Sequence, residues 1–323
     1  MLIYVSENVG SGAELLVQTL ETIYHFERIP TDITINDDHT AYIVDYATAN
    51  YTKNLVFQGI LGLEQLQMLE KRPFFMHMTI EAALRVRLQV WCDNYNDGQK
   101  DTEKFLQHTE GILERYPDLP MVFGRADVKI YVRIQEKLKL DVLAKELDRP
   151  LKSACQGRDV TSPFAHTTPF RPDWDTYFMK LATLAASRSN CMKRRVGCVI
   201  VRDYRVIATG YNGTPRHLKN CHDGGCARCN SGEHSQLSSC LCLHAEENAL
   251  LEAGRDRVGL NAILYCDTCP CLTCSVKIVQ TGIREVVYSQ SYRMDEASFK
   301  ILQEGGVLVR QFSFKEVPHY SVL

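Results

Sequence analysis

The amino-acid sequence predicts an α/β protein with two domains. From position 174 to position 312, helical segments alternate with short β-branched segments, a pattern typical of a sheet covered by helices. The chain has 323 residues, enough for two hydrophobic cores of ordinary size. The stretch 155–172 contains prolines and little periodicity, so we expect it to link domains at 1–154 and 173–323.

The first domain begins with a strand at 1–5, a glycine-rich turn and a helix at 14–24. Further strands are expected at 54–59 and 73–80, and each leads into a helical run. This order predicts an α/β domain.

The second domain has the clearer pattern of elements. Its expected helices lie at 174–189, at 244–254 with Gly254 as a stop, at 271–282 and at 296–304. Its expected strands lie at 196–201, 205–213, 262–267, 285–289 and 307–312. The alternation predicts a mixed five-stranded sheet covered by helices, with the helices at 244 and 271 on the same face.

The composition is that of an ordinary globular protein, with 45% hydrophobic and 24% charged residues. The net charge of −2 and the pI of about 6.6 argue against a nucleic-acid-binding surface. No apolar segment approaches the roughly 20 residues that span a membrane, and Met1–Val5 lacks the features of a signal peptide. We therefore expect an intracellular protein, in the cytoplasm or also in the nucleus, with neither a membrane nor a nucleic acid as partner.

The 13 cysteines are unevenly distributed. Only Cys92 and Cys155 precede position 190, whereas the others lie between Cys191 and Cys274. In a reducing compartment, such a cluster with interspersed histidines indicates metal binding rather than disulfides.

One combination of motifs predicts a catalytic zinc site. His244-Ala245-Glu246 supplies an imidazole and a carboxylate, and Pro270-Cys271-Leu272-Thr273-Cys274 supplies two thiolates. The pattern H-x-E with P-C-x-x-C is the signature of zinc deaminases that act on nucleobases. Three protein ligands (His244, Cys271 and Cys274) leave the fourth zinc position open for water, as catalytic sites do.

The chemistry accounts for the fourth residue of this set, Glu246. Zinc lowers the pKa of water from 15.7 to roughly 7. Glu246 would take the proton of that water, pass it to the ring nitrogen of the base and then to the departing ammonia. The alternatives are a structural zinc site or an inactive enzyme.

Residues 173–314 resemble the cytidine deaminase-like fold, an α/β/α architecture, and within it the deoxycytidylate (dCMP) deaminase family. The residues that carry the resemblance are Val196-Gly197, Gly210–Gly213, Asn220-Cys221, Cys242–Ala249, Pro270–Cys274 and Val287-Tyr288. The chain departs from the family pattern at Cys269 and Leu272, and neither of these positions supplies a zinc ligand.

The resemblance implies hydrolysis of dCMP to dUMP and ammonia, which supplies dUMP for dTTP synthesis. It also implies activation by dCTP, inhibition by dTTP and a homo-oligomer, for which a hexamer is common. Asn212 is the candidate for binding the nucleotide sugar, and the alternative is an asparagine that tolerates a positive φ in a turn. Tyr288 is a candidate for lining the site, and the alternative is a core tyrosine.

The resemblance further implies a second, structural zinc that ties the insertion before residue 244 to the first helix. The matching ligands are Cys191, Cys221, His234 and Cys242. A closed site of this kind contributes about 10–16 kcal/mol of apparent folding free energy. Spacing alone favours another set, Cys221, Cys226 and Cys229, and buried free cysteines are a further alternative.

Residues 1–154 faintly resemble a P-loop nucleotide kinase. Ala13 and Glu14 stand where the phosphate-binding Lys and Ser/Thr belong, and the carboxylate of Glu14 would repel phosphate. We therefore expect a degenerate kinase-like scaffold or a regulatory module.

Two other functions compete with a nucleotide deaminase. An RNA or tRNA deaminase on the same fold requires a basic, aromatic-lined surface, against which the net charge counts. A catalytically silent zinc scaffold has no need of Glu246. Spacing alone leaves the choice between cytosine and adenine open, because both deaminases use the same zinc chemistry.

Overall fold

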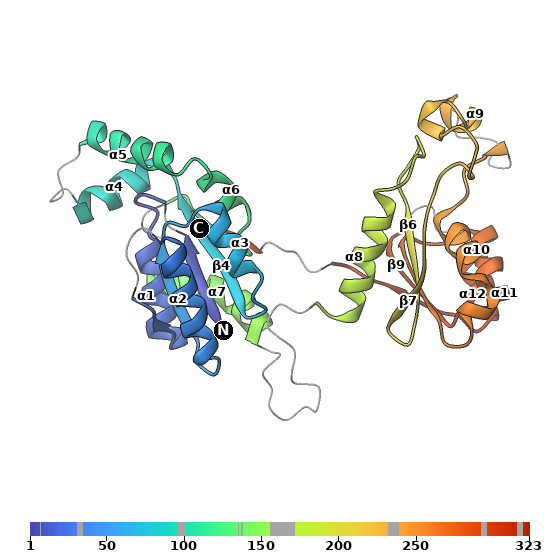
Figure 1. Cartoon of the computed structure of the whole chain (residues 1–323), viewed down its shortest axis with the longest axis horizontal. Coiled ribbons are helices and arrows are strands. Elements are labelled where there is room, and N and C mark those ends of the chain that lie inside the picture. Colours follow the sequence, from blue (N-terminus) through green and yellow to red (C-terminus); the bar gives the residue numbers. More distant parts are fainter. Residues whose placement is uncertain are drawn as a thin grey trace. The chain divides into compact units, whose positions relative to one another are not determined.

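The structure is a computed structural model that describes residues 1–6, 8–30, 35–95, 101–134, 136, 138–155, 172–231, 239–291, 296–314 and 319–323. It divides into two compact units, Met1–Arg171 with Glu316–Leu323 and Pro172–Lys315 (Figure 1). Most of the expected linker, 156–171, lies outside the described residues. None of the described helices combines the length and the hydropathy needed to cross a bilayer.

The first unit is built on a parallel six-stranded sheet with the order β11-β5-β4-β1-β3-β2. Its strands are β1 (Leu2–Ser6), β2 (Glu27–Arg28), β3 (Leu55–Gly59), β4 (Phe75–Ala82), β5 (Val128–Val132) and β11 (His319–Val322). Its helices are α1 (Ala13–Tyr24), α2 (Asp37–Ala49), α3 (Leu63–Glu70), α4 (Leu84–Tyr95), α5 (Thr102–Arg115), α6 (Leu119–Gly124) and α7 (Leu140–Cys155). The central strands are almost continuously buried, as expected where helices cover both faces of a parallel sheet.

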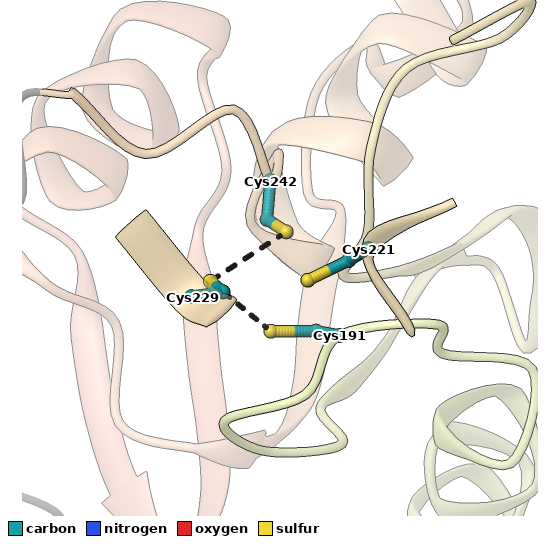
Figure 2. A group of neighbouring side chains, drawn as sticks. All are labelled: Cys191, Cys221, Cys229 and Cys242. Atoms are coloured by element: carbon teal, nitrogen blue, oxygen red, sulfur yellow. Dashed lines mark hydrogen bonds between the residues drawn. The ribbon is translucent and has the colours of Figure 1, made fainter. Parts of the chain in front are cut away.

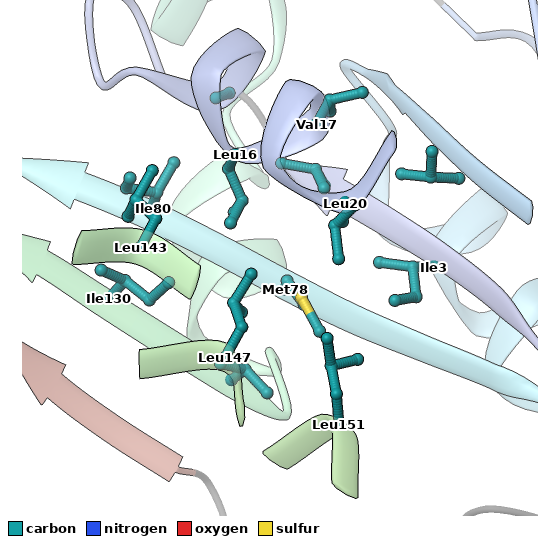
Figure 3. Packing of buried hydrophobic residues seen from close by; sticks show 14 of the residues in the cluster. Ile3, Leu16, Val17, Leu20, Met78, Ile80, Ile130, Leu143, Leu147 and Leu151 are labelled. Atoms are coloured by element: carbon teal, nitrogen blue, oxygen red, sulfur yellow. The ribbon is translucent and has the colours of Figure 1, made fainter. Parts of the chain in front are cut away.

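The core of this unit has two layers, one on each face of the sheet. In one layer, leucines of α1 and α7 pack on Ile3, Met78 and Ile80 (Figure 3). In the other, α2 and α3 cover the opposite side chains of β1 and β3, including Tyr4 and Phe57. Successive residues of a strand point to opposite faces, which is why one strand serves both layers.

The second unit contains the expected mixed five-stranded sheet, with the order β10-β9-β8-β6-β7. Its strands are β6 (Gly197–Arg202), β7 (Arg205–Tyr211), β8 (Ile263–Thr268), β9 (Glu285–Gln290) and β10 (Leu308–Gln311). β6 pairs antiparallel with β7 and β8, whereas β8, β9 and β10 run parallel.

Helices cover both faces of this sheet. They are α8 (Trp174–Ala186), α9 (Ala227–Asn230), α10 (Ala245–Val258), α11 (Leu272–Thr281) and α12 (Glu296–Glu304), with a short 3₁₀ turn, η3, at Cys221–Asp223. The four predicted helices begin and end within three residues of their predicted bounds, except at the C-terminal end of α10, and α9 was not predicted. α8 covers one face and α10, α11 and α12 cover the other (Figure 1). Gly254, the predicted stop, has a non-helical φ of 66°, but a further helical segment continues to Val258.

The expected extent of the second domain, 173–323, requires a correction at its C-terminal end. Strand β11 pairs in parallel with β5, so that His319 lies opposite Val128 and Val322 opposite Tyr131 in the sheet of the first unit. Four residues are too short to carry a periodicity that would reveal their partner in the sequence.

Candidate metal and catalytic centre

The three predicted zinc ligands come together at the N-termini of two neighbouring helices. His244 is the N-cap residue of α10, Cys271 is the N-cap residue of α11, and Cys274 lies in the first turn of α11. The Nδ1 atom of His244 lies 3.3 Å from the sulfur of Cys271 and 3.4 Å from the sulfur of Cys274. Their three ligand atoms lie within 4.8 Å of one another.

This donor set fits zinc. Typical zinc–nitrogen and zinc–sulfur bonds at a tetrahedral angle place the nitrogen about 3.6 Å from each sulfur, close to the separations found here. Hydrogen bonds from Cys274 and His244 lower the pKa of Cys271 to about 3, whereas the contact with Cys271 raises the pKa of Cys274. Without a metal the pair therefore shares one thiolate, on Cys271. The N–H groups at the two helix starts, which have no partner within their helix, further favour negative charge at this point.

Glu246 lies in the first turn of α10, two residues after His244, and only 4% of it is exposed. Its burial raises its pKa to about 7. A carboxyl group with a pKa near neutrality can both accept and donate a proton at the working pH, which a general acid–base catalyst requires. The arrangement therefore places three candidate metal ligands close to a carboxyl group that can carry a proton.

Close packing on the sheet fixes the position of α10, and a partly exposed ion pair links it to α11. A Cβ atom on Gly210 of β7 would lie 2.5 Å from the backbone nitrogen of Ala249 and would also overlap the carbonyl oxygen of Ala245. Lys277 of α11 pairs with Glu247 of α10 at 2.5 Å. The absence of a side chain at Gly210 lets the helix that carries Glu246 lie directly on the strand.

The Asn212 side chain holds a neighbouring backbone segment in place. Its Oδ1 accepts a hydrogen bond from the backbone N–H of Val196 at 2.8 Å, and its Nδ2 donates to the carbonyl of Arg194 at 2.7 Å. Its φ is not positive, so the alternative of a turn asparagine in the left-handed region is wrong. Both amide atoms have capacity for one more hydrogen bond each, so a contact with a substrate sugar stays a prediction.

Tyr288 is buried in β9, with 6% exposed, on the sheet face that α10, α11 and α12 cover. Its ring packs edge-on against Phe299 of α12, with the ring centres 6.2 Å apart. This packing matches the core alternative, and a role in lining the site stays a prediction.

Three of the four ligands expected for the second zinc also come together. The sulfurs of Cys191, Cys221 and Cys242 form a group with that of Cys229 (Figure 2). The expected fourth ligand, His234, lies outside the described residues. A second group of four, formed by Cys226, Cys229, Cys240 and Cys242, adjoins the first. The set favoured by spacing alone contained Cys229, but its other two members, Cys221 and Cys226, fall in different groups.

In the first unit, the glycine-rich turn before α1 is filled by protein. Arg87 donates hydrogen bonds to the carbonyl of Val9 and to the side chain of Asn8, both at 2.8 Å. A Cβ atom on Gly10 would overlap the backbone carbonyl of Arg87. Glu14 pairs with Arg28 at 2.7 Å. These contacts occupy the turn, and the kinase resemblance stays a prediction.

Comparison with known proteins gives a family match and close relatives. The family described as "cytidine and deoxycytidylate deaminase zinc-binding region" matches residues 172–290. A deoxycytidylate deaminase of Saccharomyces cerevisiae is 52% identical over 325 residues, which cover 100% of both chains. A deoxycytidylate deaminase of Schizosaccharomyces pombe is 44% identical over 317 residues, which cover 94% of each. Among solved structures, dCMP deaminase of the cyanophage S-TIM5 in complex with dCMP and dUMP is 30% identical, with 44% of this chain and 99% of that chain covered and a TM-score of 0.37.

Proposed function

Because this chain belongs to the deoxycytidylate deaminase family, we propose that it hydrolyses dCMP to dUMP and ammonia in a zinc-dependent reaction. The centre would consist of His244, Cys271 and Cys274 as metal ligands and Glu246 as the proton carrier. The observation that carries the proposal is the buried carboxyl of Glu246 beside three converging ligand atoms.

The residues of the chain divide the chemistry between them. Zinc, when bound, supplies Lewis-acid activation of a water molecule at neutral pH. His244 and the two cysteines would hold the metal ion. Glu246 would accept a proton from the water and deliver it to the ring nitrogen of cytosine, which keeps this proton in the product. It would then carry the second proton, from the hydroxyl that has added to the ring carbon, to the leaving amine. Its pKa of about 7 suits both directions of transfer.

The proposal is tested by ammonia release from dCMP, deoxycytidine, dCTP and a tRNA, with the same full-length, zinc-loaded protein. We expect turnover of dCMP far above that of deoxycytidine, dCTP and tRNA. Deamination of the tRNA without turnover of dCMP would instead support the RNA deaminase, against which the net charge of −2 counts.

The family resemblance also supports regulation by nucleotides and assembly of several copies. We propose dCTP as the activator, dTTP as the inhibitor and a homo-oligomer, with the hexamer as the expected form. The first unit is the candidate for a regulatory or structural role. Initial rates with each effector, and the mass of the particle by light scattering, test these proposals separately from the reaction itself.

The free state of the cysteines supports a location in the cytoplasm, or also in the nucleus. The twelve cysteines whose side chains the structure describes are free thiols. Intracellular reductants keep thiols in this state, which metal ligands require. Cell fractionation with an antibody against the protein tests this proposal.

A further inference from the structure

Six cysteines form a separate cluster near the N-terminus of α10. They come from the segment after α8 (Cys191), from η3 (Cys221), from α9 and its N-cap (Cys226 and Cys229) and from the segment before α10 (Cys240 and Cys242). Cys221 and Cys226 are fully buried, Cys229 and Cys242 are at most 8% exposed, and Cys191 and Cys240 are half-buried. Nothing in the deaminase reaction uses them.

The six sulfurs form two groups of four that share two members. Cys191 and Cys221 complete one group, Cys226 and Cys240 complete the other, and both groups contain Cys229 and Cys242. In each group the sulfurs lie within 4.8 Å of one another. The first group is shown in Figure 2, where the four side chains point toward a common centre.

The sulfur–sulfur distances match those of zinc thiolate tetrahedra. A tetrahedral zinc with zinc–sulfur bonds of about 2.3 Å requires ligand sulfurs about 3.8 Å apart. The shared pair, Cys229 and Cys242, is 3.9 Å apart, and Cys191 lies 3.9 Å from Cys229. In the other group, Cys240 lies 3.6 Å from Cys229 and 3.9 Å from Cys226.

We propose that this cluster binds two zinc ions, with the sulfurs of Cys229 and Cys242 bridging them as the shared edge of two tetrahedra. Cys191 and Cys221 are the terminal ligands of one ion, and Cys226 and Cys240 are those of the other. This goes beyond the proposed function, because the catalytic zinc uses none of these six residues. It also replaces the single four-ligand site that the family resemblance implies.

A single ion would not account for the arrangement. One ion would bind the four sulfurs of one group. The two remaining thiols of the other group would then lie equally close to the shared sulfurs without a metal ion to bind. Backbone N–H groups also point at terminal sulfurs on both sides. Those of Lys193 and Arg194 contact Cys191, and those of Cys229 and Leu241 contact Cys226. Hydrogen bonds of this kind stabilise a thiolate rather than a neutral thiol.

The charge of the cluster is also compensated locally. Six thiolates and two divalent ions leave a net charge of −2. The positively charged side chain of Arg228 donates hydrogen bonds to the sulfurs of Cys229 and Cys240 and so offsets part of this charge. The cluster would fasten the insertion and the segment after α8 to Cys242, which stands two residues before His244. The two ions would thus fix the start of α10 and hold its catalytic residues in place.

Metal analysis of the full-length protein tests the proposal. We expect three zinc ions per chain, one catalytic and two in the cluster. Cys226→Ser and Cys191→Ser should each release one ion, and the double variant should release two. Cys92→Ala, at a buried cysteine of the first unit, is the matched control and should keep all three. A total of one zinc ion per chain would overturn the proposal. So would a total of two, if Cys226→Ser leaves that number unchanged and His234→Ala lowers it to one.

A second measurement needs no variant, so it does not depend on whether a variant folds. With cadmium-113 in place of zinc, two ions that share thiolates give two resonances split by cadmium–cadmium coupling through the bridging sulfurs. The catalytic site adds a third, unsplit resonance. Two unsplit resonances in total would show a mononuclear structural site and overturn the proposal. Iron in place of zinc in the purified protein would also overturn the proposal, because thiolates also bind iron–sulfur clusters.

Discussion

Replacement of Gly210 by alanine tests whether the packing of α10 on β7 sets the geometry of the centre. The new Cβ atom would lie 2.5 Å from the nitrogen of Ala249 and would overlap the carbonyl of Ala245. Unstrained contacts between such atoms need about 3.5 Å, so α10 must move by about 1 Å. His244 and Glu246 move with the helix, whereas Cys271 and Cys274 stay on α11.

A displacement of about 1 Å at a catalytic group costs on the order of 10²-fold in rate. Overpacking of this kind also lowers the free energy of unfolding by about 1–3 kcal/mol. We therefore expect Gly210→Ala to lower kcat/KM for dCMP about 100-fold at a temperature well below its Tm. Steady-state ammonia release gives the rate, and thermal unfolding gives the stability.

Two alanine variants separate the loss of geometry from the loss of stability. Gly197→Ala produces an equally severe overlap, but with Ala182 and Ala186 of α8 on the other face of the sheet. It should lose stability and keep kcat/KM within about tenfold of the wild type. Gly111→Ala, in α5, meets nothing within 4 Å and should be neutral or stabilising. A wild-type kcat/KM and Tm for Gly210→Ala would refute the reasoning.

Two further variants test other parts of the structure. Burial, and then the charges of Lys129 and Arg125, lower the pKa of His77 from 6.5 to about 3. The unfolded chain therefore binds a proton between these pH values that the folded chain does not, so stability falls as the pH drops, by up to about 1.4 kcal/mol per pH unit. His77→Phe should remove that slope in urea unfolding series at pH 7 to 4, and a slope equal to the wild type would contradict the assignment. Asn212→Ala removes two hydrogen bonds to the backbone of Arg194 and Val196, so we expect a loss of about 1–3 kcal/mol in chemical denaturation and a higher KM for dCMP. An unchanged stability would rule out the structural role, and an unchanged KM would rule out the contact with substrate.

The sequence predicts the elements of the second unit, and the grouping of His244, Cys271 and Cys274, because these signals are local. His244 and Glu246 lie two residues apart at a helix start, and Cys271 and Cys274 lie three apart at another. Each pair therefore reaches its position through one turn of helix. The strands of the mixed sheet are likewise readable one by one, because each is a short β-branched segment between turns.

Features that depend on contacts between distant parts of the chain could not be predicted in the same way. Strand β11 follows its partner β5 by more than the length of the whole second unit, and its four residues carry no pattern that names a partner. Cys229 joins Cys191 and Cys242 only because the insertion folds back on itself, which cysteine spacing does not encode. The side-chain amide of Asn212, just after β7, bonds to the backbone of Arg194 and Val196, just before β6. The sequence does not indicate such a contact between separate segments.

Glu246→Gln tests the central claim most directly, because it removes the proton carrier and keeps the size of the side chain. The account predicts an unchanged zinc content and fold, with kcat for dCMP reduced by about 10²–10⁴-fold. Glu247→Gln, at the adjacent residue that pairs with Lys277, is the control and should stay close to the wild-type rate. A wild-type kcat in Glu246→Gln, measured on protein with its full zinc content, would contradict the account.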